Sequence, residues 1–124
     1  MAEFIPKRLF KMNNRLDVVS SLVTFSKPLE EISNELSIFD WDYEGESLIV
    51  KSDEIIEVLR RYISGEINAE EIEGWANLIE CREDIVFEAE KESELEDVIY
   101  RLANPLLEEP ISVSLCKQFV ANLS

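Results

Sequence analysis

The sequence contains no histidine and only three glycines, four prolines and two cysteines among its 124 residues. Histidine is the side chain that most often serves acid–base catalysis near neutral pH, and it is a common zinc ligand. No apolar stretch approaches the roughly 20 residues that a membrane-spanning helix needs. These absences argue against histidine-dependent catalysis, a bound metal or cofactor, and a membrane protein.

Basic residues are also scarce. Lysine and arginine total 12 against 27 aspartates and glutamates, so the net charge is −15. A protein that binds DNA or RNA replaces phosphate counterions with lysine and arginine, and this net charge repels a polyanion instead. We therefore expect no direct binding to nucleic acid.

Apolar residues make up 46% of the chain, which is enough to form a core. We find no internal repeat and no linker long enough to divide the chain, so a single helical domain over residues 1–124 is expected. Residues 1–14 show no clear period and are expected to form an irregular arm.

The two cysteines, Cys81 and Cys116, are too few and too far apart to indicate a disulfide framework. Acidic neighbours raise the pKa of a thiol, which argues against Cys81 as a nucleophile, and we expect both thiols to be bystanders. Pro6 and charged residues interrupt the segment Met1–Arg8, which has no apolar signal core. We expect a reduced, cytoplasmic protein that is not an enzyme.

The apolar spacing predicts helices over residues 15–25, 28–36, 52–64, 68–82 and 93–103, and another after Pro110. Residues 47–50 could form a short strand, but no partner strand is evident. Residues 83–91 alternate too briefly to be assigned. The predicted fold class is all-α: a compact bundle of five to six short helices with at most one short extended segment.

Three predicted helices have recognisable starts. Ser52 is expected to cap the helix that follows it, because its hydroxyl can accept from a free backbone amide. Asn68 with Glu71, and Ser93 with Glu96, have the three-residue spacing of a capping box.

Residues 40–45 open like a calcium-binding EF-hand loop, with oxygen-bearing side chains at positions 1, 3 and 5 and glycine at position 6. The pattern then fails, because Lys51 occupies position 12 and Ser47 occupies position 8. Two other interpretations remain open: an acidic turn anchored by Trp41, or a recognition loop. The candidate contacts of such a loop are Asp40, Asp42, Tyr43, Glu44 and Glu46.

The negative charge is concentrated in one block. Residues 66–97 hold thirteen acidic residues against two basic ones, Arg82 and Lys91, which is a net charge of −11. Residues 1–30 instead carry five basic residues against three acidic ones, a net charge of +2. This distribution suits a positively charged partner, although simple solubility would also account for it.

The predicted helix over residues 68–82 shows how these acids are placed. Its apolar stripe consists of Ile72, Trp75, Ala76 and Ile79. Opposite this stripe lie Glu70, Glu73, Asn77 and Glu80. Like charges three or four residues apart do not stabilise a helix, and no lysine interrupts them. We therefore take these four residues as candidate contacts with a basic partner.

Several segments carry a resemblance to a known family. They are Arg60–Ile67, Trp75–Glu80 with Arg82, Asp84 and Ile85, and Leu102–Pro105. In these segments, within residues 39–123, the sequence resembles the helical immunity proteins of contact-dependent growth inhibition and related bacteriocin systems. The resemblance implies 1:1 binding to a cognate secreted toxin domain, commonly a nuclease, whose active site is blocked. It carries over no catalytic residue and no individual contact.

The charge pattern and the resemblance agree in pointing to a binding protein. A nuclease presents lysine and arginine where phosphates bind, and a carboxylate-rich surface can occupy those positions. The function we expect is that of an immunity protein for a basic nuclease toxin. The alternative is an acidic adaptor or assembly protein for some other basic partner.

Overall fold

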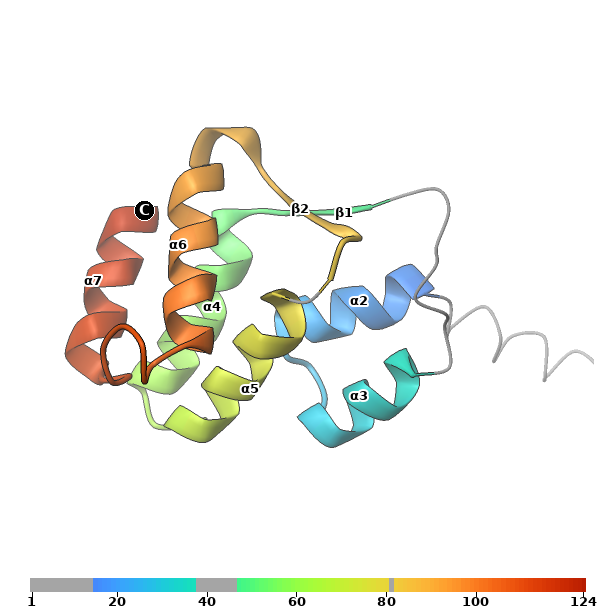
Figure 1. The fold of residues 1–124 in the computed structure, drawn as a ribbon, viewed down its shortest axis with the longest axis horizontal. Helices are drawn as coiled ribbons and strands as arrows, with labels where there is room; N and C mark the ends of the chain where they lie inside the picture. The colour runs from blue at the N-terminus through green and yellow to red at the C-terminus, as the bar shows by residue number, and fades with distance from the viewer. Residues whose placement is uncertain (1–14, 38–46, 81) are drawn as a thin grey trace, which may run out of the picture.

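The computed structural model describes residues 15–37, 47–80 and 82–124. Within these ranges the chain is mostly helical (Figure 1). Its α-helices are α2 (Arg15–Thr24), α3 (Leu29–Leu36), α4 (Ser52–Ile63), α5 (Ala69–Glu80), α6 (Glu92–Ala103) and α7 (Val113–Leu123). The remaining elements are β1 (Leu48–Val50), β2 (Ile85–Phe87) and the 3-10 helix η1 (Ala89–Lys91). The predicted all-α fold class is confirmed, including the extended segment near residues 47–50.

The helices form two groups that α5 joins. In Figure 1, α4, α6 and α7 lie on one side, α2 and α3 lie on the other, and the two strands cross the top. The closest packing is between α5 and α6 and between α4 and α7, and α2 contacts α3, α4 and α5. None of the helices in the described ranges is long and apolar enough to cross a membrane.

The core is mostly aliphatic, with Phe25 and Phe119 and one tryptophan, which lies at the contact between α5 and α2. Trp75 is fully buried, and its indole Nε1 donates a hydrogen bond of 2.8 Å to the carbonyl oxygen of Leu22. A buried indole N–H needs such an acceptor, because an unpaired polar group in the core is destabilising. The predicted stripe of α5 is confirmed, since Ile72, Ala76 and Ile79 are buried with Trp75.

The start of α5 follows the predicted capping box. The backbone amide of Glu71 donates to Asn68 Oδ1 at 2.8 Å, and the amide of Asn68 donates to Glu71 Oε1 at 2.9 Å. These two bonds satisfy amides that a helix leaves without partners in its first turn. The first turn of α5 is therefore determined by residues three positions apart.

The predicted cap of α4 is wrong. The helix begins at Ser52 itself, and the Ser52 backbone amide donates to Glu88 Oε2 at 2.7 Å. The pKa of the Glu88 carboxyl lies below its ordinary value because of this hydrogen bond. One partner at this helix start is local, since the Lys51 amide donates to Glu54 Oε1 at 3.0 Å, but Glu88 follows β2 and local spacing cannot reveal it.

The second predicted capping box, Ser93 with Glu96, is also wrong. The 3-10 turn of η1 runs directly into α6, which begins at Glu92 after Lys91 as its N-cap. Ser93 is therefore inside the helix. The reason is that the chain has already turned helically before it reaches Ser93.

The two strands form a parallel pair that the sequence did not predict. Leu48, Ile49 and Val50 pair with Ile85, Val86 and Phe87 in register. The connection between the strands contains α4 and α5, as a parallel pair requires a long crossover. Residues 83–91 do alternate briefly, but pairing between segments so far apart leaves no sign of the partner in either segment.

A buried carboxylate holds the start of β2. Among the described residues, Asp84 is the one charged side chain that is buried, at 1% exposure. Arg82 donates to it through Nε at 2.8 Å and Nη2 at 2.9 Å, and Arg15 Nη1 donates at 2.7 Å. The Asp84 carbonyl oxygen also accepts from the Leu48 amide at 2.8 Å. Asp84 thus connects α2, β1 and β2.

These donors keep Asp84 ionised. The pKa of Asp84 lies below its ordinary value, chiefly because Arg82 donates to the carboxylate, while burial acts in the opposite direction. A carboxyl whose pKa is lower in the folded chain stabilises the fold above its unfolded pKa of about 3.9. That contribution is lost as the pH falls through the folded pKa.

We expect Asp84→Asn to lower the free energy of unfolding by about 3 kcal/mol at pH 7, because two arginines lose their buried counter-charge. Urea denaturation from pH 7 to pH 3 should show the difference from the parent chain narrowing below about pH 4, where Asp84 itself becomes protonated. The exposed Glu96→Gln is the control, with a change under about 0.5 kcal/mol. A difference for Asp84→Asn that is constant over this range would contradict the role of its charge.

Candidate functional site

The four residues predicted opposite the α5 stripe form one surface of that helix, which we call the α5 acidic face: Glu70, Glu73, Asn77 and Glu80. Three of them are exposed, and Glu73 is half-buried. The half-burial of Glu73 follows from its position beside Gly74, which α3 approaches closely. A Cβ atom on Gly74 would lie 2.9 Å from Leu29 Cδ1. The structure therefore brings the four residues together and limits access on the side where α3 packs.

No cation neutralises this face within residues 15–37, 47–80 and 82–124. Glu70 and Glu73 form no ion pair there, and Glu80 only accepts a 3.5 Å hydrogen bond from Asn104 Nδ2. Several cations of the described part pair with other carboxylates. Arg61 pairs with Glu66 at 2.8 Å, and Lys27 pairs with Glu35 at 3.0 Å.

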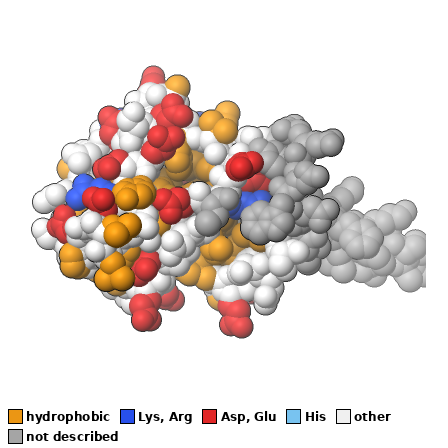
Figure 2. Space-filling model, in the orientation of Figure 1, with side chains coloured by type: hydrophobic (Ala, Val, Ile, Leu, Met, Phe, Trp, Pro, Cys, Tyr) orange, Lys and Arg blue, Asp and Glu red, His pale blue; other side chains and the backbone are white. Residues whose placement is uncertain are grey.

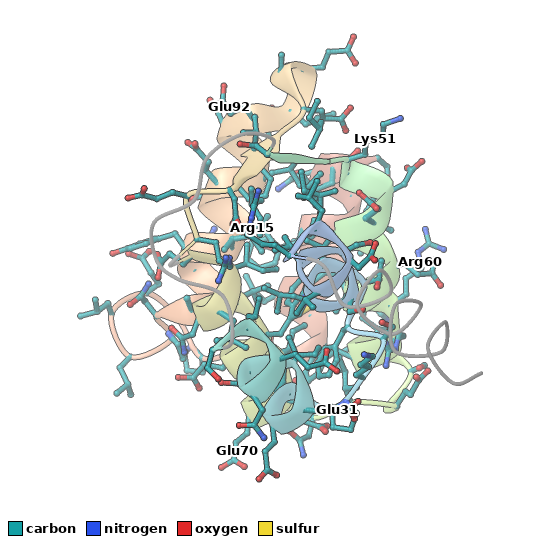
Figure 3. The ribbon with its side chains drawn as sticks, turned by 90° about the vertical axis from the view of Figure 1, so that its right-hand side faces the viewer. Arg15, Glu31, Lys51, Arg60, Glu70 and Glu92 are labelled. Atoms are coloured by element: carbon teal, nitrogen blue, oxygen red, sulfur yellow. The ribbon has the colours of Figure 1, made fainter. Side chains whose placement is uncertain are left out.

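A second group of exposed carboxylates lies at the start of α6. It comprises Glu90, Glu92, Glu94 and Glu96. In Figure 3, Glu92 lies at the opposite end of the molecule from Glu70, whereas Lys51 and Arg60 lie along a third side. Figure 2 likewise shows carboxylates gathered at the top, around the start of α6, and others at the bottom. The dense acidic block of the sequence thus divides into two separate surfaces.

The second predicted patch is Asp40, Asp42, Tyr43, Glu44 and Glu46, and it lies outside the described residues. Residues 47–51 are the described part of the EF-hand-like segment, and Lys51 at its end is the N-cap of α4. Within the described ranges, cysteine, aspartate and glutamate side chains form no group of three or more that could hold a metal ion.

The described cysteine, Cys116, is buried in α7. Burial raises the pKa of its thiol to about 11, so the thiol stays protonated at neutral pH. Cys81 lies outside the described residues. A shallow open hollow on α7 is lined by Val113, Ser114, Lys117, Gln118 and Ala121, and it contains no carboxylate. Neither feature offers the paired groups that nucleophilic or carboxylate catalysis requires.

One surface feature was not predicted from the sequence. Leu106 and Leu107, in the loop between α6 and α7, are 99% and 72% exposed. They follow Asn104, whose side-chain Nδ2 donates to Glu80 of the α5 acidic face at 3.5 Å and to the Tyr100 carbonyl oxygen at 2.8 Å. The only sequence signal was an apolar pair that follows Asn104–Pro105 and belongs to no helical stripe.

Comparisons of the chain with protein-family models, with curated proteins and with solved structures found no match. What this chain does must therefore be argued from its own residues. The surface features of the described part that bear on function are the α5 acidic face, the acidic start of α6 and the exposed leucine pair.

Proposed function

We propose that this chain is an immunity protein that binds a cognate secreted toxin domain and blocks its active site. The toxin domain would be a basic nuclease, bound 1:1 in the cytoplasm of the protected cell. The observation that carries the proposal is the α5 acidic face, whose carboxylates have no cationic partner within the described residues. The sequence resemblance to helical immunity proteins supports the same function.

The acids on this face do not stabilise α5 as a pair. Glu70 and Glu73 are spaced as neighbours on one helix face, and like charges at that spacing are weakly destabilising. A surface helix chosen only for stability would interleave lysines with them. An anionic face is useful when a cationic surface has to be attracted and covered.

A nuclease active site suits such a face. The site must hold a phosphodiester backbone, and arginine and lysine are the residues that bind phosphates. Carboxylates placed over those cations form charge-assisted hydrogen bonds and exclude the nucleic acid. The inhibitor then acts as a polyanion in place of the substrate, and it needs no chemistry of its own.

The alternative is an acidic adaptor for another basic protein. The position of the gene distinguishes an adaptor from an immunity protein. An immunity gene lies directly downstream of the toxin gene that it protects against. We expect co-expression with the C-terminal domain of the upstream-encoded toxin to restore growth, and the purified chain to inhibit that domain at a 1:1 ratio. Growth that stays arrested at equal expression would contradict the proposal and favour the adaptor.

Reversing charge on the α5 acidic face should slow association with the toxin domain. We expect Glu70→Lys with Glu80→Lys to lower kon about tenfold or more at low salt, because the long-range attraction is reduced. The difference should shrink as added salt shortens the screening length to about 10 Å or less, because the long-range attraction is then weakened. Stopped-flow or interferometry measurements over a salt series would check this.

The matched control is Asp53→Lys with Glu57→Lys. These two exposed acids lie on α4, one of them in the first turn as Glu70 is in α5, and the change in net charge is the same. We expect kon of the control to fall by less than about threefold. Equal slowing in both variants would mean that overall charge matters and that the α5 acidic face is only solvated surface.

A further inference from the structure

The loop between α6 and α7 exposes two adjacent leucines. Leu106 and Leu107 are the most exposed large apolar residues in the described part of the chain. In Figure 2, apolar side chains gather at the end of the molecule where Figure 1 places this loop. Single exposed leucines are common on protein surfaces, but an adjacent pair held in water is the kind of feature that marks an interaction site.

The turn that carries the leucines is held in place. The Leu107 and Glu108 amides both donate to the Asn104 carbonyl oxygen at 3.1 Å. Arg101 pairs with Glu109 at 3.1 Å, and its guanidinium lies 5.3 Å from the centre of the Phe119 ring. The loop is therefore tied to the end of α6, and the same arginine packs against α7. Side chains presented by such a turn lose little further conformational freedom on binding.

The same turn adjoins the α5 acidic face. Asn104 bonds Glu80 through its side chain and the Leu107 amide through its carbonyl group. The surroundings of the leucines are acidic as well, with Asp97, Glu108 and Glu109 exposed along α6 and the loop. Arg101, the nearby cation, is already engaged by Asp97 at 3.7 Å and by Glu109.

We propose that Leu106 and Leu107 are the apolar anchor of the toxin-binding interface. This inference rests on the proposed function and adds which residues hold the complex together. The occupant is a protein surface with an apolar pocket rimmed by lysine and arginine. The acidic rim selects such a partner by charge, and it would repel nucleic acid or anionic lipid.

The two parts of this surface have different tasks. Exposed carboxylates act over several ångströms and raise the rate of encounter. Apolar side chains act only in contact, and burying them in a pocket slows dissociation. We therefore expect changes to the α5 acidic face to alter mainly kon, and changes to the leucine pair to alter mainly koff.

The test compares Leu106→Ser with Leu107→Ser, made together, against the parent chain on the immobilised toxin domain. We expect koff to rise about 100-fold, because a central apolar anchor is lost from the contact. We expect kon to change by less than about threefold, because the carboxylates remain. Circular dichroism and urea unfolding of both full chains confirm that the fold is unchanged.

The matched control is Ile49→Thr with Val86→Thr. These residues are also exposed, at 62% and 44%, and they pair across β1 and β2 at a different end of the molecule (Figure 1). Threonine keeps the β-branched shape that a strand favours. We expect koff of this control to stay within about threefold of the parent value.

Each failure has a distinct signature. If the parent chain binds tightly and the leucine variant has an unchanged koff, the anchor is refuted while the proposed function stands. If the parent chain does not bind the toxin domain, the proposed function fails and the anchor fails with it. If sedimentation shows a parent dimer that the leucine variant converts to monomer, the occupant is a second copy of the chain and the proposal is overturned.

Discussion

The fold depends on a buried carboxylate. Two strands of three residues each are too short to hold together by their own ladder. Asp84 fixes the first end of β2 through two arginines and the Leu48 amide, and Glu88 fixes the second end by accepting from Ser52. Because α4 and α5 form the crossover between the strands, these contacts also help to hold the crossover, and α5 with it, against α2. The position of the candidate site follows from that placement.

Two classes of acid can be distinguished among the described residues. Asp84, Glu88 and Glu71 accept from arginines or from backbone amides, and they hold elements in place. Carboxylates such as Glu73, which lies beyond the first turn of α5, have no such partner within the described ranges, and they add repulsion to a chain of net charge −15. Their repulsion opposes folding, and the aliphatic core and the first class of acids offset it. An acid that does not help the fold needs another explanation, and attraction of a cationic partner provides one.

What the sequence could predict depended on the distance over which each interaction acts. The capping box of Asn68 with Glu71 spans three residues, and the buried stripe of α5 repeats along one helix, so both were predicted correctly. Glu88, which accepts from the Ser52 amide at the start of α4, lies 36 positions away, and Arg15 reaches Asp84 across 69 positions. Neither contact leaves a periodic trace. The α5 acidic face was predictable for the same reason as its stripe, because it is the other side of the same helix.

The leucine pair could not be predicted, since exposure is a property of the folded neighbourhood. In the sequence, Leu106 and Leu107 look like ordinary core residues after a helix end. The ion pair of Arg101 with Glu109 and the turn at Asn104 hold the loop so that both leucines are exposed. The Asn104 side chain in turn bonds Glu80. This adjacency has a physical consequence. Charges set how often a partner arrives, and apolar contact sets how long it stays, but the two combine only if one encounter engages both. Asn104, which bonds to both features, is the residue that brings them within a single footprint.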